Sequence, residues 1–209
     1  MSLSLKGLQR VALHLLCLVP VLWLFSLAAT DGLGANPAEA LLRDLGLWAL
    51  RFVCLALAVT PLRVWLGWTR LAAYRRMLGL YAFFYGSLHW LCYLLLDMGL
   101  DWAAVLEDLA KRPFILVGTL AWAILLVLAV TSIPRLIRRM GGKRWQALHR
   151  AVYAAAALAV LHFWWMRAGK NNLAEVGVYL AIVAALLLAR VLHRYTKGRR
   201  IGHPRPPVR

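Results

Sequence analysis

The chain has few acidic residues and few cysteines. Its 209 residues include eight Asp and Glu against 25 Lys and Arg, and three cysteines that form neither a CxxC nor a CxxCH sequence. This cysteine pattern argues against a thiol redox motif, covalent attachment of a c-type haem and a disulfide framework. The sequence also has no GxGxxG motif and no P-loop, so the common signatures of nucleotide binding are missing.

Long apolar segments dominate the chain instead. Hydrophobic residues make up 63% of it and the mean hydropathy is +0.69, a balance that soluble domains of this size do not have. The first segment is long for the apolar part of a signal peptide, so we expect it to be retained. The predicted fold class is an all-α integral membrane protein, a six-transmembrane-helix bundle with spans at residues 10–29, 46–62, 77–96, 114–133, 147–166 and 174–193.

The charged residues are divided between the two ends of these spans. Nineteen of the 25 Lys and Arg lie in the N-terminus, the 63–76 loop, the 134–150 segment and the tail from Arg190 onward, and all eight acidic residues lie on the other side. By the positive-inside rule both termini are cytoplasmic. A net charge of +17 would suggest nucleic acid as a partner of a soluble protein, but charge in membrane loops predicts no nucleic-acid partner. We expect one six-helix domain, residues 1–199, and a basic, Pro-rich cytoplasmic tail, residues 200–209, lying on anionic lipid.

Three histidines lie within the apolar segments, where an imidazole is costly unless something binds it. His89 is in the third span, and His149 and His162 are thirteen residues apart in the fifth. At about 1.5 Å per residue, His149 and His162 are roughly 20 Å apart along the axis, which leaves His89 and His162 at similar depth near the periplasm. Because neutral imidazole is the usual axial ligand of a membrane haem, His89 and His162 could ligate one iron and His149 could serve a second haem. Thirteen residues place His149 and His162 roughly 140° apart on an ideal helix, so we expect either a bend or bulge in this span or haems docked at different angles around it.

Arginines accompany the histidines at both depths. Arg75 is fourteen residues before His89 and at the depth of His149, where it could reach a haem propionate or stand near an open iron position. Arg51, in the second span, either snorkels to the membrane surface or pairs with a propionate of the outer haem. A subset of the cytoplasmic arginines could hold the phosphate of FMN, because paired guanidiniums suit that geometry; the set is Arg75, Arg76, Arg135, Arg138, Arg139, Arg144 and Arg150.

Four stretches of the second to fifth spans carry a further pattern: TPLR (60–63), RRMLGLYAFFYGSLHWLCYLLLD (75–97), AVTS (129–132) and WQALHRAVYAAAALAVLHFWW (145–165). In this order and spacing they resemble the ferric-reductase-like transmembrane haem proteins, most closely the haem-binding membrane subunits of bacterial methionine sulfoxide reductase systems. The resemblance implies that the family's histidine ligands correspond to His89, His149 and His162. The wider superfamily often has two histidines on each helix, and this chain has Arg75 where the fourth would fall.

The resemblance implies an electron-transfer subunit of the bacterial inner (cytoplasmic) membrane that carries one or two b-type haems and can bind FMN. Its electrons would come from membrane quinone, with a cytoplasmic flavin reductase as another donor. They would go to a periplasmic molybdenum-containing reductase that repairs methionine sulfoxide. The chain would then carry no catalytic residue of its own, because the cofactor supplies the redox chemistry.

Three other functions are open at this point. A stand-alone transmembrane reductase of extracytoplasmic metal predicts activity without a partner. A proton or ion transporter with a histidine relay predicts a colourless protein, and a structural or assembly factor predicts no stoichiometric haem. For the electron-transfer subunit, we expect the partner to dock on the acidic 97–112 loop.

Overall fold

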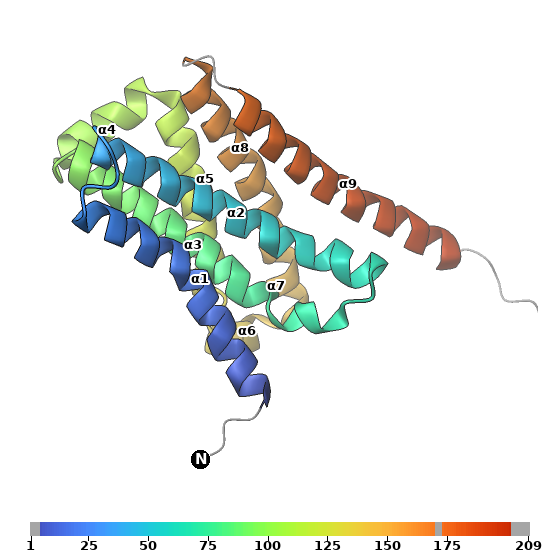
Figure 1. The fold of residues 1–209 in the computed structure, drawn as a ribbon. Helices are drawn as coiled ribbons and strands as arrows, with labels where there is room; N and C mark the ends of the chain where they lie inside the picture. Colours follow the sequence, from blue (N-terminus) through green and yellow to red (C-terminus); the bar gives the residue numbers. More distant parts are fainter. Residues whose placement is uncertain (1–4, 170–172, 202–209) are drawn as a thin grey trace, which may run out of the picture.

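The computed structural model describes residues 5–169 and 173–201, and within these ranges the chain is helical and has no strand (Figure 1). Six of its helical segments are long and apolar enough to cross a membrane, which confirms the predicted six-helix membrane fold. The long helices are α1 (Leu5–Ala29), α2 (Pro37–Trp65), α3 (Arg75–Cys92), α5 (Pro113–Val130), α8 (Val152–Ala168) and α9 (Ala174–Ile201). Shorter helices are α4 (Trp102–Lys111), α6 (Pro134–Met140) and α7 (Gly142–Leu148).

The bundle is built from two closely packed helix pairs. α2 packs most extensively against α3, and α5 against α8, while α3 and α5 join the two pairs. α9 packs on α2 and α8, and α1 packs on α2. Figure 1 shows α4 at one end of this bundle and α6 with α7 at the other. The α2–α3 and α5–α8 pairs therefore form the interior in which a cofactor site can lie.

The second helix begins earlier than the hydrophobic pattern predicts. α2 starts at Pro37 rather than at residue 46, because Asn36 caps the helix by accepting the Glu39 N–H at 3.2 Å and proline is favoured in the first turn. Arg51 is consequently the midpoint of this 29-residue helix. The span expected from residue 46 would place Arg51 about one turn inside its outer end, and the earlier start of α2 corrects that placement.

The fifth span is broken at His149, which is one of the two outcomes that its histidine spacing allowed. α7 ends at Leu148, a single 3₁₀ turn covers His149–Ala151, and α8 follows from Val152. A 3₁₀ turn has fewer residues per turn than an α-helix, so it rotates the side chains that follow it relative to those before. The break therefore changes the angle between His149 and His162 around the span from the value of an unbroken helix.

Tyrosine anchors the first helix to the third. Tyr85 is fully buried, and its hydroxyl donates to the Cys17 carbonyl at 2.7 Å and accepts the Val21 N–H at 3.1 Å. The Tyr85 hydroxyl thus lies between the Cys17 carbonyl and the Val21 N–H of α1, beside Pro20, which has no N–H for the helical hydrogen bonds. At the other end of the chain α9 continues to Ile201, and residues 202–209 of the predicted tail lie outside the described residues.

Candidate functional site

His89 and His162 face each other across the interior of the bundle. The centroids of their rings are 6.1 Å apart and the ring planes are inclined by 77°. Two imidazoles that bind one metal ion from opposite sides, each through a bond of about 2.0–2.1 Å, have centroids roughly 6 Å apart. The predicted equal depth of these two residues is thus confirmed, at a separation that suits one shared metal ion.

Both rings are oriented by main-chain carbonyls of a neighbouring helix. His89 Nδ1 on α3 donates to the Leu42 carbonyl of α2 at 2.8 Å, and His162 Nδ1 on α8 donates to the Phe114 carbonyl of α5 at 2.7 Å. Because a carbonyl oxygen can only accept, each Nδ1 carries the proton and each Nε2 keeps its lone pair for a metal. This is the arrangement that fixes the tautomer of metal-binding histidines and strengthens them as ligands.

The two histidines line a cavity of about 260 Å³ with mainly apolar walls. Trp90 and Trp122 form one wall, stacked with centroids 4.6 Å apart and planes inclined by 2°, and the Trp122 indole donates to Ser87 Oγ at 3.0 Å. Two glycines also line the cavity: Gly46 lies against the His89 ring and Gly118 against the His162 ring. We call this space the His89 cavity.

Charged residues line the His89 cavity as well. Arg43, Arg112 and Arg167 each pair with a carboxylate: Arg43 with Glu39 at 3.2 Å, Arg167 with Glu175 at 3.2 Å, and Arg112 with Asp108. Asp108 is buried and also accepts the Tyr93 hydroxyl at 2.8 Å. A planar apolar molecule that carries carboxylates would suit this slot if its carboxylates took the place of the arginines' present partners.

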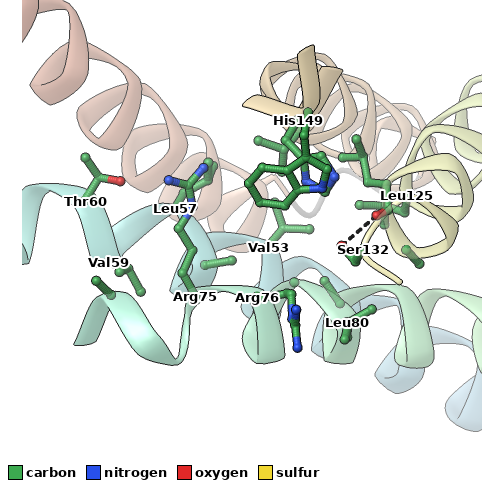
Figure 2. A pocket seen from close by; sticks show the side chains of 18 of the residues that line it. Val53, Leu57, Val59, Thr60, Arg75, Arg76, Leu80, Leu125, Ser132 and His149 are labelled. Carbon is green, nitrogen blue, oxygen red and sulfur yellow. Dashed lines mark hydrogen bonds between the residues drawn. The ribbon is translucent and has the colours of Figure 1, made fainter. Parts of the chain in front are cut away.

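A second cavity, of about 270 Å³, contains His149 and is called the His149 cavity. Arg63, Arg75 and Arg76 line it, and no acidic residue does so among the described parts of the chain. Figure 2 shows Arg75 reaching from the start of α3 up towards Leu57, whereas Arg76 points the other way. Arg75 and His149 therefore line the same cavity, and contact of Arg75 with a haem stays a prediction.

His149 is held differently from the histidine pair. Its Nε2 lies 3.2 Å from Thr131 Oγ1, and its ring lies 4.0 Å from the Trp145 ring, which in turn donates to the Thr131 carbonyl at 3.0 Å. The Thr131 hydroxyl has its own acceptor in the Val127 carbonyl at 2.7 Å, so Nε2 is the donor to Thr131. In this tautomer the His149 Nε2 carries a proton, so it has no free lone pair with which to bind a metal ion in the cavity.

The two cavities meet inside the bundle. Val53 of α2 and Leu125 of α5 line both of them. Apart from these two side chains, the two spaces are lined by different residues. Cofactors held at the two histidine sites would therefore be neighbours across one layer of aliphatic side chains.

Arg51 lies away from both cavities. Its Nε donates to the Tyr179 hydroxyl of α9 at 2.9 Å, and its guanidinium lies 4.5 Å from the centre of the Trp48 ring. The structure thus places it between α2 and α9, and pairing with a propionate stays a prediction. Of the arginines suggested for a flavin phosphate, Arg75 and Arg76 line the His149 cavity, and the remaining five do not.

The acidic 97–112 loop contains a short helix that the sequence analysis missed. Asp101 caps α4 by accepting the Ala103 and Ala104 N–H groups, Glu107 pairs with Lys111, and Asp108 pairs with Arg112. Asp97 lines the His89 cavity. Because these carboxylates have structural partners or face the cavity, the loop offers less unpaired negative charge to a docking protein than its composition suggests.

Sequence reasoning also missed the groups that complete the His89 cavity. Arg43, Arg112 and Arg167 were not singled out, although each lies within one or two turns of the end of a span. The carbonyls of Leu42 and Phe114 have no sequence signature. Gly46 and Gly118 do have one, since both are isolated glycines inside apolar helices, where a glycine is unfavourable without a packing reason.

Comparison with known proteins places this geometry in a family. Residues 45–160 match the model of the ferric reductase like transmembrane component. The chain is 54% identical over 208 residues to the protein-methionine-sulfoxide reductase heme-binding subunit MsrQ of Polaromonas naphthalenivorans, covering 96% of this chain and 95% of that one. The MsrQ proteins of Ralstonia nicotianae (53% over 182 residues; 87% and 84% covered) and Rhodospirillum rubrum (46% over 185 residues; 88% of each) are also similar. The chain therefore belongs to the ferric-reductase-like transmembrane family and, within it, to the family of the MsrQ proteins.

Proposed function

We propose that this protein is the haem-binding membrane subunit of a methionine sulfoxide reductase system, and that it transfers electrons from membrane quinone to the periplasmic molybdenum-containing reductase MsrP. The observation that carries the proposal is the facing pair of His89 and His162. Their ring centroids are 6.1 Å apart, and each Nδ1 donates its proton to a main-chain carbonyl. The names of the relatives, heme-binding subunits of a methionine sulfoxide reductase, agree with it.

The residues present fit a b-type haem at the His89 cavity. His89 and His162 would hold the iron, and Arg43, Arg112 and Arg167 are the cations that would pair with the propionates. A haem iron held by two imidazoles supplies one-electron oxidation and reduction. The apolar walls, including the stacked Trp90 and Trp122, keep water from the metal, and the carbonyl-bound Nδ1 atoms hold each ring in the tautomer that can ligate.

The His149 cavity would take a second cofactor, either another haem or FMN. His149 could ligate an iron after exchanging its bond to Thr131, and Arg63, Arg75 and Arg76 supply cations for propionates or a phosphate. The cytoplasmic placement of this end, the bacterial inner membrane as location and a cytoplasmic flavin reductase as an additional donor belong to the same proposal. They rest on the charge asymmetry of the loops and on the family.

The test is transfer to the partner in a membrane. The purified, haem-loaded protein in liposomes with reduced quinone would reduce methionine sulfoxide only when MsrP is present, and a His89→Ala variant would not. His14→Ala is the matched control, because His14 bonds Tyr81 and lines neither cavity. Reduction of ferric citrate without MsrP, together with no transfer to MsrP, would contradict the proposal in favour of a stand-alone metal reductase.

A further inference from the structure

The two histidines of the His89 cavity rest on the same local structure, repeated on two helix pairs. His89 of α3 donates to the carbonyl of Leu42, and four residues later on α2 comes Gly46. His162 of α8 donates to the carbonyl of Phe114, and four residues later on α5 comes Gly118. Residues four apart lie on one face of a helix, so in each pair the imidazole covers a carbonyl and the glycine one turn beyond it.

Neither glycine has room for a side chain. A Cβ atom on Gly46 would lie 2.9 Å from Nδ1 and 3.0 Å from Cε1 of His89. A Cβ atom on Gly118 would lie 2.8 Å from Nδ1 and 2.9 Å from Cε1 of His162. Both sets of distances are too short for a carbon atom. Each ring would have to move away from the helix that holds its Nδ1 proton.

We infer that Gly46 and Gly118 are positioning residues for the metal ligands, each forming with its carbonyl partner a flat seat that sets the direction of one imidazole. The inference rests on the proposed haem site. The backbone gives a separate reason for it. Both glycines are inside helices and have no positive φ, so neither is required by its own conformation, and alanine would suit each helix better. Glycine is therefore explained at these positions by the imidazole that lies on it.

His149 shows that the seat is specific to the facing pair. Its ring bonds a threonine hydroxyl through Nε2 and lies against Trp145, without a carbonyl and glycine pair beneath it. The His89 cavity is consequently pre-organised for two ligands on one metal, and the His149 cavity is not.

The inference is tested with Gly46→Ala and Gly118→Ala in the haem-loaded, full-length protein. Haem release to an excess of a haem-scavenging protein should become about 10- to 100-fold faster in each, the range found when groups that orient metal ligands are changed. The low-spin electron paramagnetic resonance signal of the ferric protein should shift or convert to high spin. Gly177→Ala is the control, because it adds the same methyl group to α9 with nothing within 4 Å, and it should behave as wild type.

Since each glycine supports one ligand, either variant decides the question by itself if the other cannot be purified. Wild-type haem release together with a wild-type spin signal in a variant would overturn the role of that glycine. A wild-type protein that binds no haem would instead contradict the proposed function, and the two failures are thereby distinguished.

Discussion

His149 differs from His89 and His162 in the nitrogen that it can offer to a metal. Its Nε2 proton is bound by Thr131, whereas the other two histidines are bound through Nδ1. Iron ligation through Nε2 at this position must first break the bond to the threonine. We therefore expect the two cavities to differ in their affinity for haem, with the His89 cavity binding more tightly.

Removing the Thr131 hydroxyl should make His149 a better ligand. A Thr131→Val variant no longer accepts the Nε2 proton, and the hydrogen bond it loses is worth about 1 kcal/mol, or roughly a fivefold gain in affinity at the His149 cavity. Haem titration of the purified protein, with absorbance read at the second equivalent, measures this. Thr60→Val is the control, since Figure 2 shows Thr60 in the same cavity but far from His149. An unchanged second equivalent in Thr131→Val would show that the threonine does not restrain the ring.

At the level of single helices, a proline on α2 leaves a carbonyl without its helical donor, and an arginine on α9 donates to that carbonyl instead. Pro61 lacks an N–H, which leaves the Leu57 carbonyl one turn earlier on α2 without its helical donor. The buried Arg190 of α9 donates to this carbonyl, and also to its own Leu186 carbonyl at 2.9 Å, with its guanidinium 5.4 Å from the centre of the Tyr153 ring. The buried guanidinium of Arg190 thus has a hydrogen-bond acceptor in the carbonyl that Pro61 leaves without a backbone donor on the neighbouring helix.

Replacing Arg190 should therefore cost less when Pro61 is also replaced. Arg190→Met is expected to lower the free energy of unfolding by about 1.5–3 kcal/mol, the value for hydrogen bonds to charged groups. In a Pro61→Ala background the loss should be smaller by about 0.5–1.5 kcal/mol, because the substituted alanine would supply the missing N–H to the Leu57 carbonyl. Denaturant titration in detergent of the four proteins of this cycle gives the coupling. Pro20→Ala in α1 is the comparison, and a coupling no larger than that of Pro20 would refute the account.

The helices also show what could be predicted from the sequence and what could not. Hydrophobic length located all six spans, but the start of α2 depends on the cap at Asn36 and Pro37, which a hydropathy profile does not register. α4 was missed because it is only ten residues long, although Asp101 as a cap and the buried Val105 mark it. The break at His149 was one of two outcomes that the thirteen-residue spacing of the histidines allowed, and the spacing alone did not choose it over haems docked at different angles.

The closeness of His89 and His162 was predictable from the sequence, and their surroundings were less so. Depth along the spans brought His89 and His162 together correctly, because an α-helix rises by a fixed distance per residue. The carbonyls of Leu42 and Phe114, and the glycines beside them, depend on how each helix is rotated against its neighbour, and sequence alone does not fix that rotation. Arg51 illustrates the same limit: its depth followed a wrong helix start, and its partner, Tyr179, lies on another helix.

At the scale of the whole molecule, the charge distribution predicts the orientation in the membrane. The end of the bundle with α6 and α7 carries Arg135, Arg138, Arg139 and Arg144, and the opposite end carries α4 and its acidic residues (Figure 1). The positive-inside rule predicts that the α6–α7 end is cytoplasmic. The His149 cavity would then lie towards the donor side and the His89 cavity towards the periplasm.

Reporter insertions in living bacteria check this orientation. Green fluorescent protein fused after residue 209 should fluoresce, and alkaline phosphatase inserted at Gly99, in the turn before α4, should be active. The Gly99 site suits an insertion because it is an exposed turn with φ of +57°. Active alkaline phosphatase at the C-terminus, with none at Gly99, would reverse the proposed direction of electron flow.

The two cavities and their shared wall give the molecule a route between its ends. Val53 and Leu125 are the side chains common to both, so a pair of cofactors would be separated by aliphatic groups and not by a charged or hydrated layer. In the proposed function the histidine pair at the His89 cavity is the centre of this arrangement, because electrons would leave from it to a periplasmic partner.

The measurement that tests this centre most directly is the electron paramagnetic resonance spectrum of the ferric, haem-loaded protein and its histidine variants. Wild type, His14→Ala and His149→Ala should show the low-spin signal of an iron held by two imidazoles, and His89→Ala and His162→Ala should each lose it. Persistence of that signal in either His89→Ala or His162→Ala would contradict the account, because the iron would then have its two imidazoles from elsewhere.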